Sequence, residues 1–132
     1  MINTNTGSIK INEGLEITLE YTFEDFKKSE YYAGQDGIRI ISIKDVQMID
    51  KKKYRVSFCF RNDKIAFVSL MNCDTEITFE DEPQRKIIHD KILKEYGIES
   101  GKRYKWGQVV SHYDPKGTIS SIIISWNIDN ED

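Results

Sequence analysis

The feature that most constrains this fold is a β-hairpin signal in the C-terminal third of the chain. Residues 104–113 alternate large apolar and polar side chains, which is the pattern of a strand with one buried face. An Asp-Pro-Lys-Gly sequence follows at positions 114–117 and favours a reversal of the chain. Residues 118–128 then form a second, more apolar run. The pattern predicts an antiparallel hairpin at the end of the fold.

Three further strands are predicted in the middle of the chain. Residues 38–43 form the first, with a possible extension to Ile49, and residues 54–61 and 64–71 form the second and third. The Asn-Asp pair at positions 62–63 is typical of a tight turn, so the second and third strands are expected to pair antiparallel. A polar reversal at positions 50–53 has the same character. These patterns therefore predict a β-meander in the middle of the chain.

Two helices are predicted. Residues 81–96 form the main one: acidic side chains crowd its first turn, Pro83 suits that turn, and Gly97 stands where a left-handed cap is expected. The second is short, opens at Thr22 with Asp25 three positions later as a capping box, and runs toward Tyr31. Residues 15–21 before it alternate as a strand.

These elements predict one α+β domain over residues 1–132. Its antiparallel sheet of about six strands, a meander plus the C-terminal hairpin, would carry the main helix and the short helix on one face. Residues 1–7 and 129–132 are expected to be frayed. A chain of 132 residues with 39% hydrophobic and 31% charged residues can bury a core without disulfides or metals.

Composition also limits the partners and the location. The net charge of −3 does not favour a nucleic-acid partner, which would need clustered Lys and Arg. No apolar run is long enough to cross a bilayer and no signal peptide is visible, so a cytoplasmic protein without a membrane partner is expected. Cys59 and Cys73 are expected to be reduced, buried thiols.

Catalytic and metal-binding patterns are weak. The spacings of Cys59, Cys73, His89 and His112 match no usual zinc pattern, so neither a metal nor a cofactor is expected. The best candidates for an enzyme or a nucleic-acid processing domain are His112, Tyr113 and Asp114, because a histidine and a tyrosine near an acid suit general acid–base work. His112 could also meet Ser120 or Ser121 across the hairpin. This remains the alternative hypothesis.

Acidic residues are segregated along the chain. Residues 11–26 and residues 72–84 each contain five acids and no Lys or Arg, and the tail adds Asp129, Glu131 and Asp132. An acidic face would steer a basic partner toward it. The competing interpretation is that these acids form a solvated helix N-terminus and protect an edge strand against aggregation. The candidate partner-binding residues lie at a strand end and the start of the main helix: Glu76, Glu80, Asp81 and Glu82.

The C-terminal third also resembles a protein family. The helix end Leu-Lys-Glu-Tyr-Gly at 93–97, the Tyr-Lys-Trp-Gly at 104–107, the turn at 113–117 and the Ser-Ile-Ile-Ile at 121–124 resemble small bacterial immunity proteins of polymorphic toxin and contact-dependent inhibition systems. The resemblance implies a protein that binds a cognate toxin domain and occludes its active site, with no catalysis and no cofactor. It transfers no contact residue. A self-associating module that uses a sheet edge is a further alternative.

Overall fold

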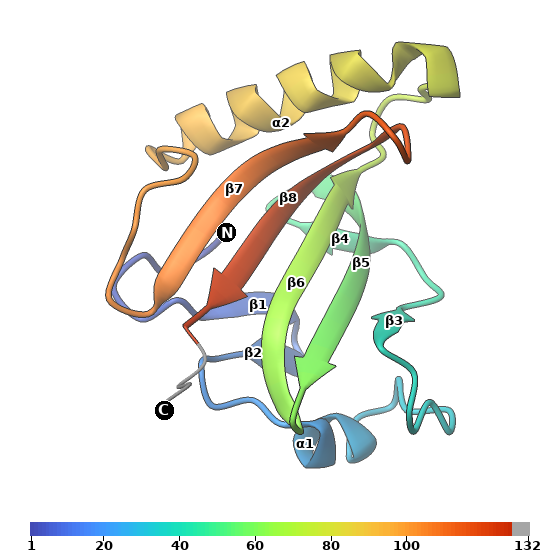
Figure 1. Ribbon diagram of the computed structural model, residues 1–132, viewed down its shortest axis with the longest axis vertical. Coiled ribbons are helices and arrows are strands. Elements are labelled where there is room, and N and C mark those ends of the chain that lie inside the picture. The colour runs from blue at the N-terminus through green and yellow to red at the C-terminus, as the bar shows by residue number, and fades with distance from the viewer. Residues whose placement is uncertain (128–132) are drawn as a thin grey trace.

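A curved antiparallel sheet of six strands organises the molecule (Figure 1). The computed structural model describes residues 1–127, apart from the side chain of Phe79. The strands of the sheet are β3 (Ile40–Ser42), β4 (Gln47–Ile49), β5 (Lys52–Arg61), β6 (Lys64–Asn72), β7 (Gly107–Asp114) and β8 (Ile119–Trp126). The remaining elements are β1 (Ile9–Asn12), β2 (Leu15–Ile17), α1 (Phe23–Lys27), the 3-10 turn η1 (Phe79–Asp81) and α2 (Glu82–Glu95). The predicted α+β class is confirmed.

The meander forms through two tight turns. Asn62 and Asp63 have φ values of 51° and 71°, and Asp50 and Lys51 have values of 49° and 70°, so each pair makes the left-handed reversal that suits a two-residue hairpin. β5 therefore pairs with β6 on one side and with both β3 and β4 on the other. The strand predicted from residue 38 to Ile49 is split in two by the segment 43–46.

The C-terminal hairpin pairs β7 with β8 from Gly107 opposite Trp126 to Asp114 opposite Ile119. β7 begins three residues later than predicted, because residues 104–107 form a tight reversal. In it, the Tyr104 N–H donates to the Gly107 carbonyl at 2.7 Å. The hairpin joins the meander through β8, which pairs with β6, and the sheet order is β3-β5-β6-β8-β7.

The outer edge of β7 is covered by the segment that precedes it. The Gly101 N–H donates to the Val109 carbonyl at 2.8 Å, and the Ser111 N–H donates to the Ser100 hydroxyl at 2.9 Å. Since backbone groups on this edge are already bonded, much of β7 is closed to pairing with another strand.

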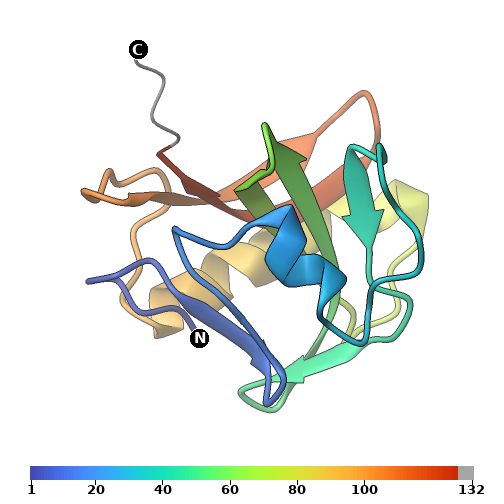
Figure 2. The ribbon, with the colours of Figure 1, turned by 90° about the horizontal axis from the view of Figure 1, so that it is seen from below.

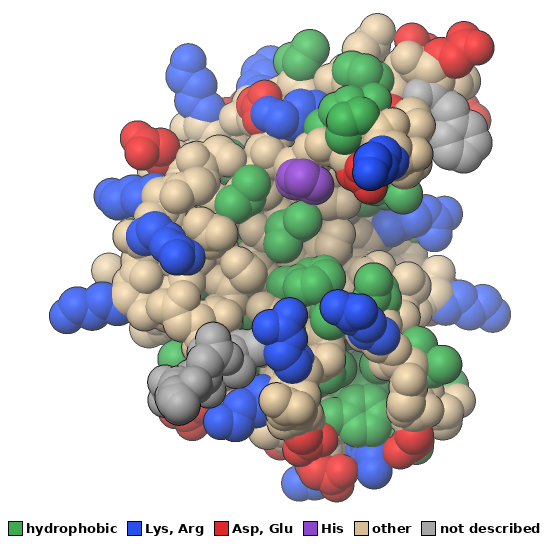
Figure 3. All heavy atoms as spheres, viewed as in Figure 1, with side chains coloured by type: hydrophobic (Ala, Val, Ile, Leu, Met, Phe, Trp, Pro, Cys, Tyr) green, Lys and Arg blue, Asp and Glu red, His purple; other side chains and the backbone are tan. Residues whose placement is uncertain are grey.

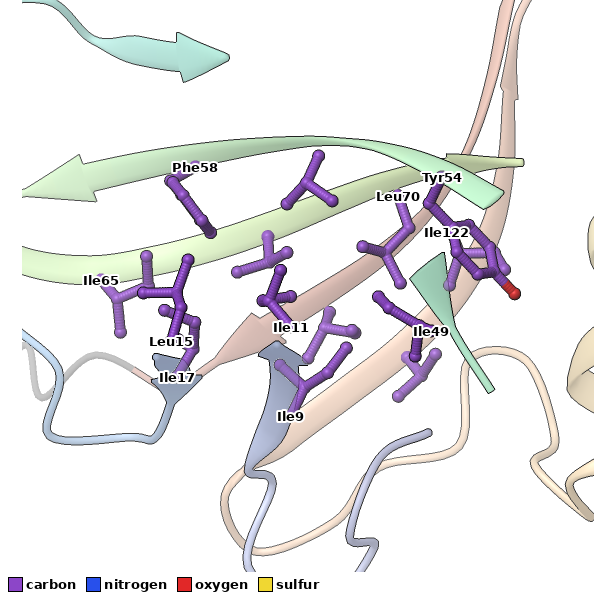
Figure 4. Packing of buried hydrophobic residues seen from close by; sticks show 14 of the residues in the cluster. Ile9, Ile11, Leu15, Ile17, Ile49, Tyr54, Phe58, Ile65, Leu70 and Ile122 are labelled. Carbon is purple, nitrogen blue, oxygen red and sulfur yellow. The ribbon is translucent and has the colours of Figure 1, made fainter. Parts of the chain in front are cut away.

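The core fills one side of the sheet. α2 packs on β7 and β8, and the β1–β2 hairpin and α1 lie on the same side (Figure 2). Isoleucines of the hairpin, such as Ile9 and Ile17, point toward apolar residues of β5 and β6, such as Phe58 and Leu70 (Figure 4). α1 adds Phe26, whose ring meets Phe58 edge-on with 5.9 Å between centroids. Within residues 1–127, the opposite face of the sheet carries no helix.

Residues 1–7, which the sequence predicts to be frayed, are bound by two tryptophans. Trp106 donates its indole N–H to the Thr4 carbonyl at 2.8 Å, and Trp126 donates its own to the Gly7 carbonyl at 2.9 Å. A buried indole needs an acceptor for its N–H, and the N-terminal backbone provides it. The tail residues 129–132 lie outside the described part of the chain.

The N-terminal elements differ from the prediction in length. The strand predicted over residues 15–21 ends at Ile17 and pairs with β1, which was not predicted. The capping box is confirmed: the Thr22 hydroxyl accepts the Asp25 N–H at 3.1 Å, and the Asp25 carboxylate accepts the Thr22 N–H at 3.0 Å. The helix that it opens ends at Lys27 and does not reach Tyr31.

Candidate functional site: the outer face of the sheet

The face of the sheet that points away from α2, here called the outer face, is built from alternate residues of all six strands. Register places Ser42 opposite Ser57 and Ser57 opposite Ser69, so a row of three serines crosses β3, β5 and β6. The hydroxyls of Ser42 and Ser57 are 3.0 Å apart and hydrogen-bonded. Ser69 is followed in the same row by Ile123 of β8.

Small serine side chains leave the outer face hollowed. One hollow of about 440 Å³ lies over β3, β5, β6 and β8, with the serine row in its floor and apolar walls that include Ile40, Phe67, Met71 and Ile119. A second hollow of about 460 Å³ is lined by Val46, Met48, Lys53, Arg55 and Cys73. Arg55 lines both hollows, which are therefore neighbours on one surface.

Several apolar side chains of this face are exposed to solvent. Ile40 is 53% exposed and Met48 is 59% exposed, while Phe67 and Met71 are half-buried. Hydrophobic side chains follow the middle of this face in Figure 3, and Lys and Arg side chains stand around them. A contiguous apolar area with a polar rim is typical of a surface that contacts another molecule.

The charge of the outer face is positive where it is hollowed. Lys53 and Arg55 line the hollows, and neither hollow has an Asp or Glu among its lining residues. The acidic side chains visible in Figure 3 lie mainly near the top and the bottom of the view. The chain therefore combines a net charge of −3 with a cationic outer face.

The four candidate partner-binding acids do not form one exposed group. Glu76, Glu80 and Asp81 are exposed, and Asp81 accepts a hydrogen bond from the Thr78 hydroxyl at 3.2 Å. Glu82 is only 6% exposed, and both of its carboxylate oxygens accept from Nε of Arg85, at 2.9 and 3.1 Å. Glu82 is therefore withdrawn from the candidate surface, because its charge is buried and already paired.

The two acidic segments lie at opposite ends of β6. Thr22, in the first segment, bridges to Lys64 at the start of β6, and the second segment begins at Asn72, where β6 ends. A strand of nine residues spans about 26 Å, so the segments do not share a patch. Several of their acids serve local structure, as Asp25 does in the capping box and Glu24 does in an ion pair with Lys27. Asp129, Glu131 and Asp132 lie outside the described residues.

Glu82 belongs to a buried polar cluster, which comprises Asn72, Glu82, Arg85, His89 and Ser120. The Ser120 N–H donates to the Glu82 carboxylate at 3.0 Å, and Arg85 also donates through Nη1 to the Asn72 carbonyl. The Asn72 N–H donates to Nε2 of His89 at 3.0 Å. These bonds fasten α2 to the ends of β6 and β8, so the cluster orients the helix over the sheet.

His89 makes the stability of the fold sensitive to acid. Burial, with a smaller contribution from the nearby Arg85 charge, lowers the pKa of His89 from 6.5 to about 4. The unfolded chain therefore binds a proton on this residue at higher pH than the folded chain does. We expect stability to fall as the pH drops from about 6.5 toward 4, by up to about 3 kcal/mol, and this contribution to level off below that range.

Urea unfolding across this pH range measures the effect, with His89→Gln as the matched variant. The glutamine carbonyl can accept the Asn72 N–H but does not titrate, so its stability curve is expected to be flatter. If the free energy of unfolding depends on pH in the same way in both proteins, the acid sensitivity does not come from His89.

The alternative catalytic residues do not converge on a site. His112 lies opposite Ser121 on the outer face, as the hairpin pattern allowed, but Tyr113 points to the other face because neighbours along a strand alternate. The Asp114 carboxylate accepts the Lys116 N–H at 3.0 Å and so stabilises the turn. Within residues 1–127, no three His, Cys, Asp or Glu side chains are grouped as a metal site would need.

Comparison with protein-family models, with curated proteins and with solved structures finds no match for this chain. In the described part of the chain, no helix has both the length and the apolar character needed to cross a membrane.

The outer face was not predicted from the sequence. A usable signal existed in residues 64–72, where apolar residues such as Phe67 and Met71 occupy the phase that faces water as well as the phase that faces the core.

Proposed function

We propose that this protein binds another protein on the outer face of its sheet, and that the partner is a toxin domain of the class implied by the sequence resemblance. The observation that carries the proposal is the hollowed, partly apolar outer face, which no element of the described chain covers. A partner bound at this face would be covered by most of the width of the sheet. An immunity protein needs no more chemistry than this, since occlusion is enough to neutralise a toxin.

The binding proposal is favoured over the enzyme alternative by the arrangement of the candidate side chains. Nucleophilic or acid–base catalysis needs a nucleophile and a base within hydrogen-bond reach, oriented by a third group. Tyr113 points to the opposite face of the sheet from His112, and Asp114 is engaged in its own turn. The outer face, in contrast, presents apolar and cationic groups together, as protein interfaces do.

The proposal is tested with the C-terminal domain of a secreted toxin whose gene adjoins the gene for this chain. Co-expression of the chain is expected to restore growth of cells that make the toxin domain, and calorimetry is expected to detect a stable complex. Failure of both would contradict the toxin assignment.

A pair of variants then tests whether the outer face makes the contact. Phe67→Asp puts a charge in the wall of the larger hollow and is expected to weaken the complex by about 30-fold or more, which is the effect of losing a residue worth about 2 kcal/mol. Ile87→Asp makes the same kind of change on α2, where Ile87 is 65% exposed, and is expected to leave affinity unchanged. Equal affinities for the two variants would exclude the outer face, and thermal unfolding checks that both are folded.

A further inference from the structure

Arg55 occupies a distinctive position on the outer face. It lies on β5 opposite Met71 of β6, is exposed, and lines both hollows. Within residues 1–127 it forms no ion pair, as is the case for most Lys and Arg side chains of the chain. Its guanidinium is thus a fixed positive charge at the centre of a partly apolar surface.

The surroundings of Arg55 match one kind of group. A guanidinium binds a carboxylate through two parallel hydrogen bonds, and the hydroxyls of Ser57 and Ser69 in the adjoining hollow offer donors for the remaining lone pairs. Met71 and Ile119 in the walls suit apolar neighbours of that carboxylate. A partner that covers the hollow would exclude water from it, so an ion pair formed there would be stronger than one on an open surface.

We propose that Arg55 is the anchoring cation of the outer face and that it takes an Asp or Glu side chain, flanked by apolar residues, from the surface of the partner protein. This inference rests on the proposed function, because it presumes a protein partner at this face, and it adds the chemistry of that partner. Lys53 increases the attraction, since it lines the second hollow and brings a second positive charge to the face.

The same chemistry disfavours two other occupants. In a symmetric dimer the same patch meets itself, so a second copy would bring Arg55 and Lys53 close to their own counterparts. A nucleic acid would need more clustered cations and a series of exposed aromatic rings, whereas the hollows contain two cations and the single ring of Phe67.

Selection of a random displayed peptide library on the immobilised full chain tests the inference without a known partner. Enriched peptides are expected to carry Asp or Glu next to Leu, Ile, Phe or Trp. Arg55→Glu is expected to lower the affinity of the best peptide by about 10- to 100-fold, as loss of a charge-assisted pair does. Arg55→Lys is expected to have a smaller effect because it keeps the charge and loses the fork. Lys91→Glu, an equal charge change on exposed α2, is the matched control and should bind as the wild type does.

Three results would overturn the inference. These are no enrichment of acidic peptides, equal binding by the wild type and Arg55→Glu, or tight binding of a polyuridylate oligonucleotide that depends on Arg55.

The toxin experiment separates this inference from the proposed function. If the toxin domain binds and Arg55→Glu has no effect on it, the anchor is wrong and the function stands. If acidic peptides bind through Arg55 and the toxin domain does not bind, the anchor stands and the toxin assignment fails.

Discussion

Replacement of Arg85 with alanine is expected to lower the free energy of unfolding by about 3–5 kcal/mol. Arg85 is 7% exposed and is the charge partner of Glu82, which is equally buried. Its loss would leave the Glu82 carboxylate uncompensated and would remove a hydrogen bond to the Asn72 carbonyl. Urea denaturation at neutral pH measures the change.

The control for this prediction removes both charges together. A Glu82→Leu/Arg85→Met double variant has no buried unpaired charge, so we expect it to be much more stable than Arg85→Ala despite carrying two substitutions. The Ser120 N–H would still lose its acceptor, which sets a residual cost of about 1–3 kcal/mol. A double variant as unstable as Arg85→Ala would mean that packing, and not charge pairing, holds α2 on the sheet.

Replacement of Gly107 with alanine is expected to be at least as damaging, with a loss of about 4 kcal/mol or more. Gly107 has a φ of 153°, and a β-carbon built there would overlap the carbonyl oxygen of Ser125 on β8. That oxygen is backbone in a paired strand and has little freedom to move. The variant must therefore separate the start of β7 from β8, which also disturbs Trp106.

Gly101→Ala is the matched control. Gly101 also has a positive φ, 86°, but nothing lies within 4 Å of the β-carbon position. It should therefore show only the cost of the left-handed backbone, about 1–2 kcal/mol. Thermal unfolding of the two variants side by side separates the steric effect from the backbone effect. Similar melting temperatures for the two variants would contradict the predicted steric overlap of a β-carbon at position 107 with the Ser125 carbonyl.

Local patterns predicted the elements that depend on neighbours in the sequence. The turn at 62–63, the capping box of Thr22 and the hairpin of β7 and β8 were all predictable because each is specified by a few consecutive residues. β1 was missed although Ile9 and Ile11 alternate with polar residues, because the segment is only four residues long. The placement of the preceding residues 1–7 depends on hydrogen bonds from tryptophans more than 100 positions away.

The candidate site was less predictable than the fold. Acidic residues that cluster in the sequence were expected to cluster in space, but β6 separates the two segments by its full length. Glu82 is similar to its acidic neighbours in sequence, yet one turn along α2 Arg85 pairs with it and draws it inside. The outer face joins residues of six strands, and its composition follows from a strand order that no local pattern encodes.

Both edges of the sheet also limit how this molecule can pair with other chains. Residues 100–104 occupy much of the β7 border, and the opposite border consists of β3 and β4, each only three residues long and separated by a break. Within the described chain, a foreign strand thus finds little free main chain to extend. We therefore expect growth of fibrils by edge addition to be disfavoured, and we expect the proposed partner to be recognised by side chains rather than by pairing of backbone strands.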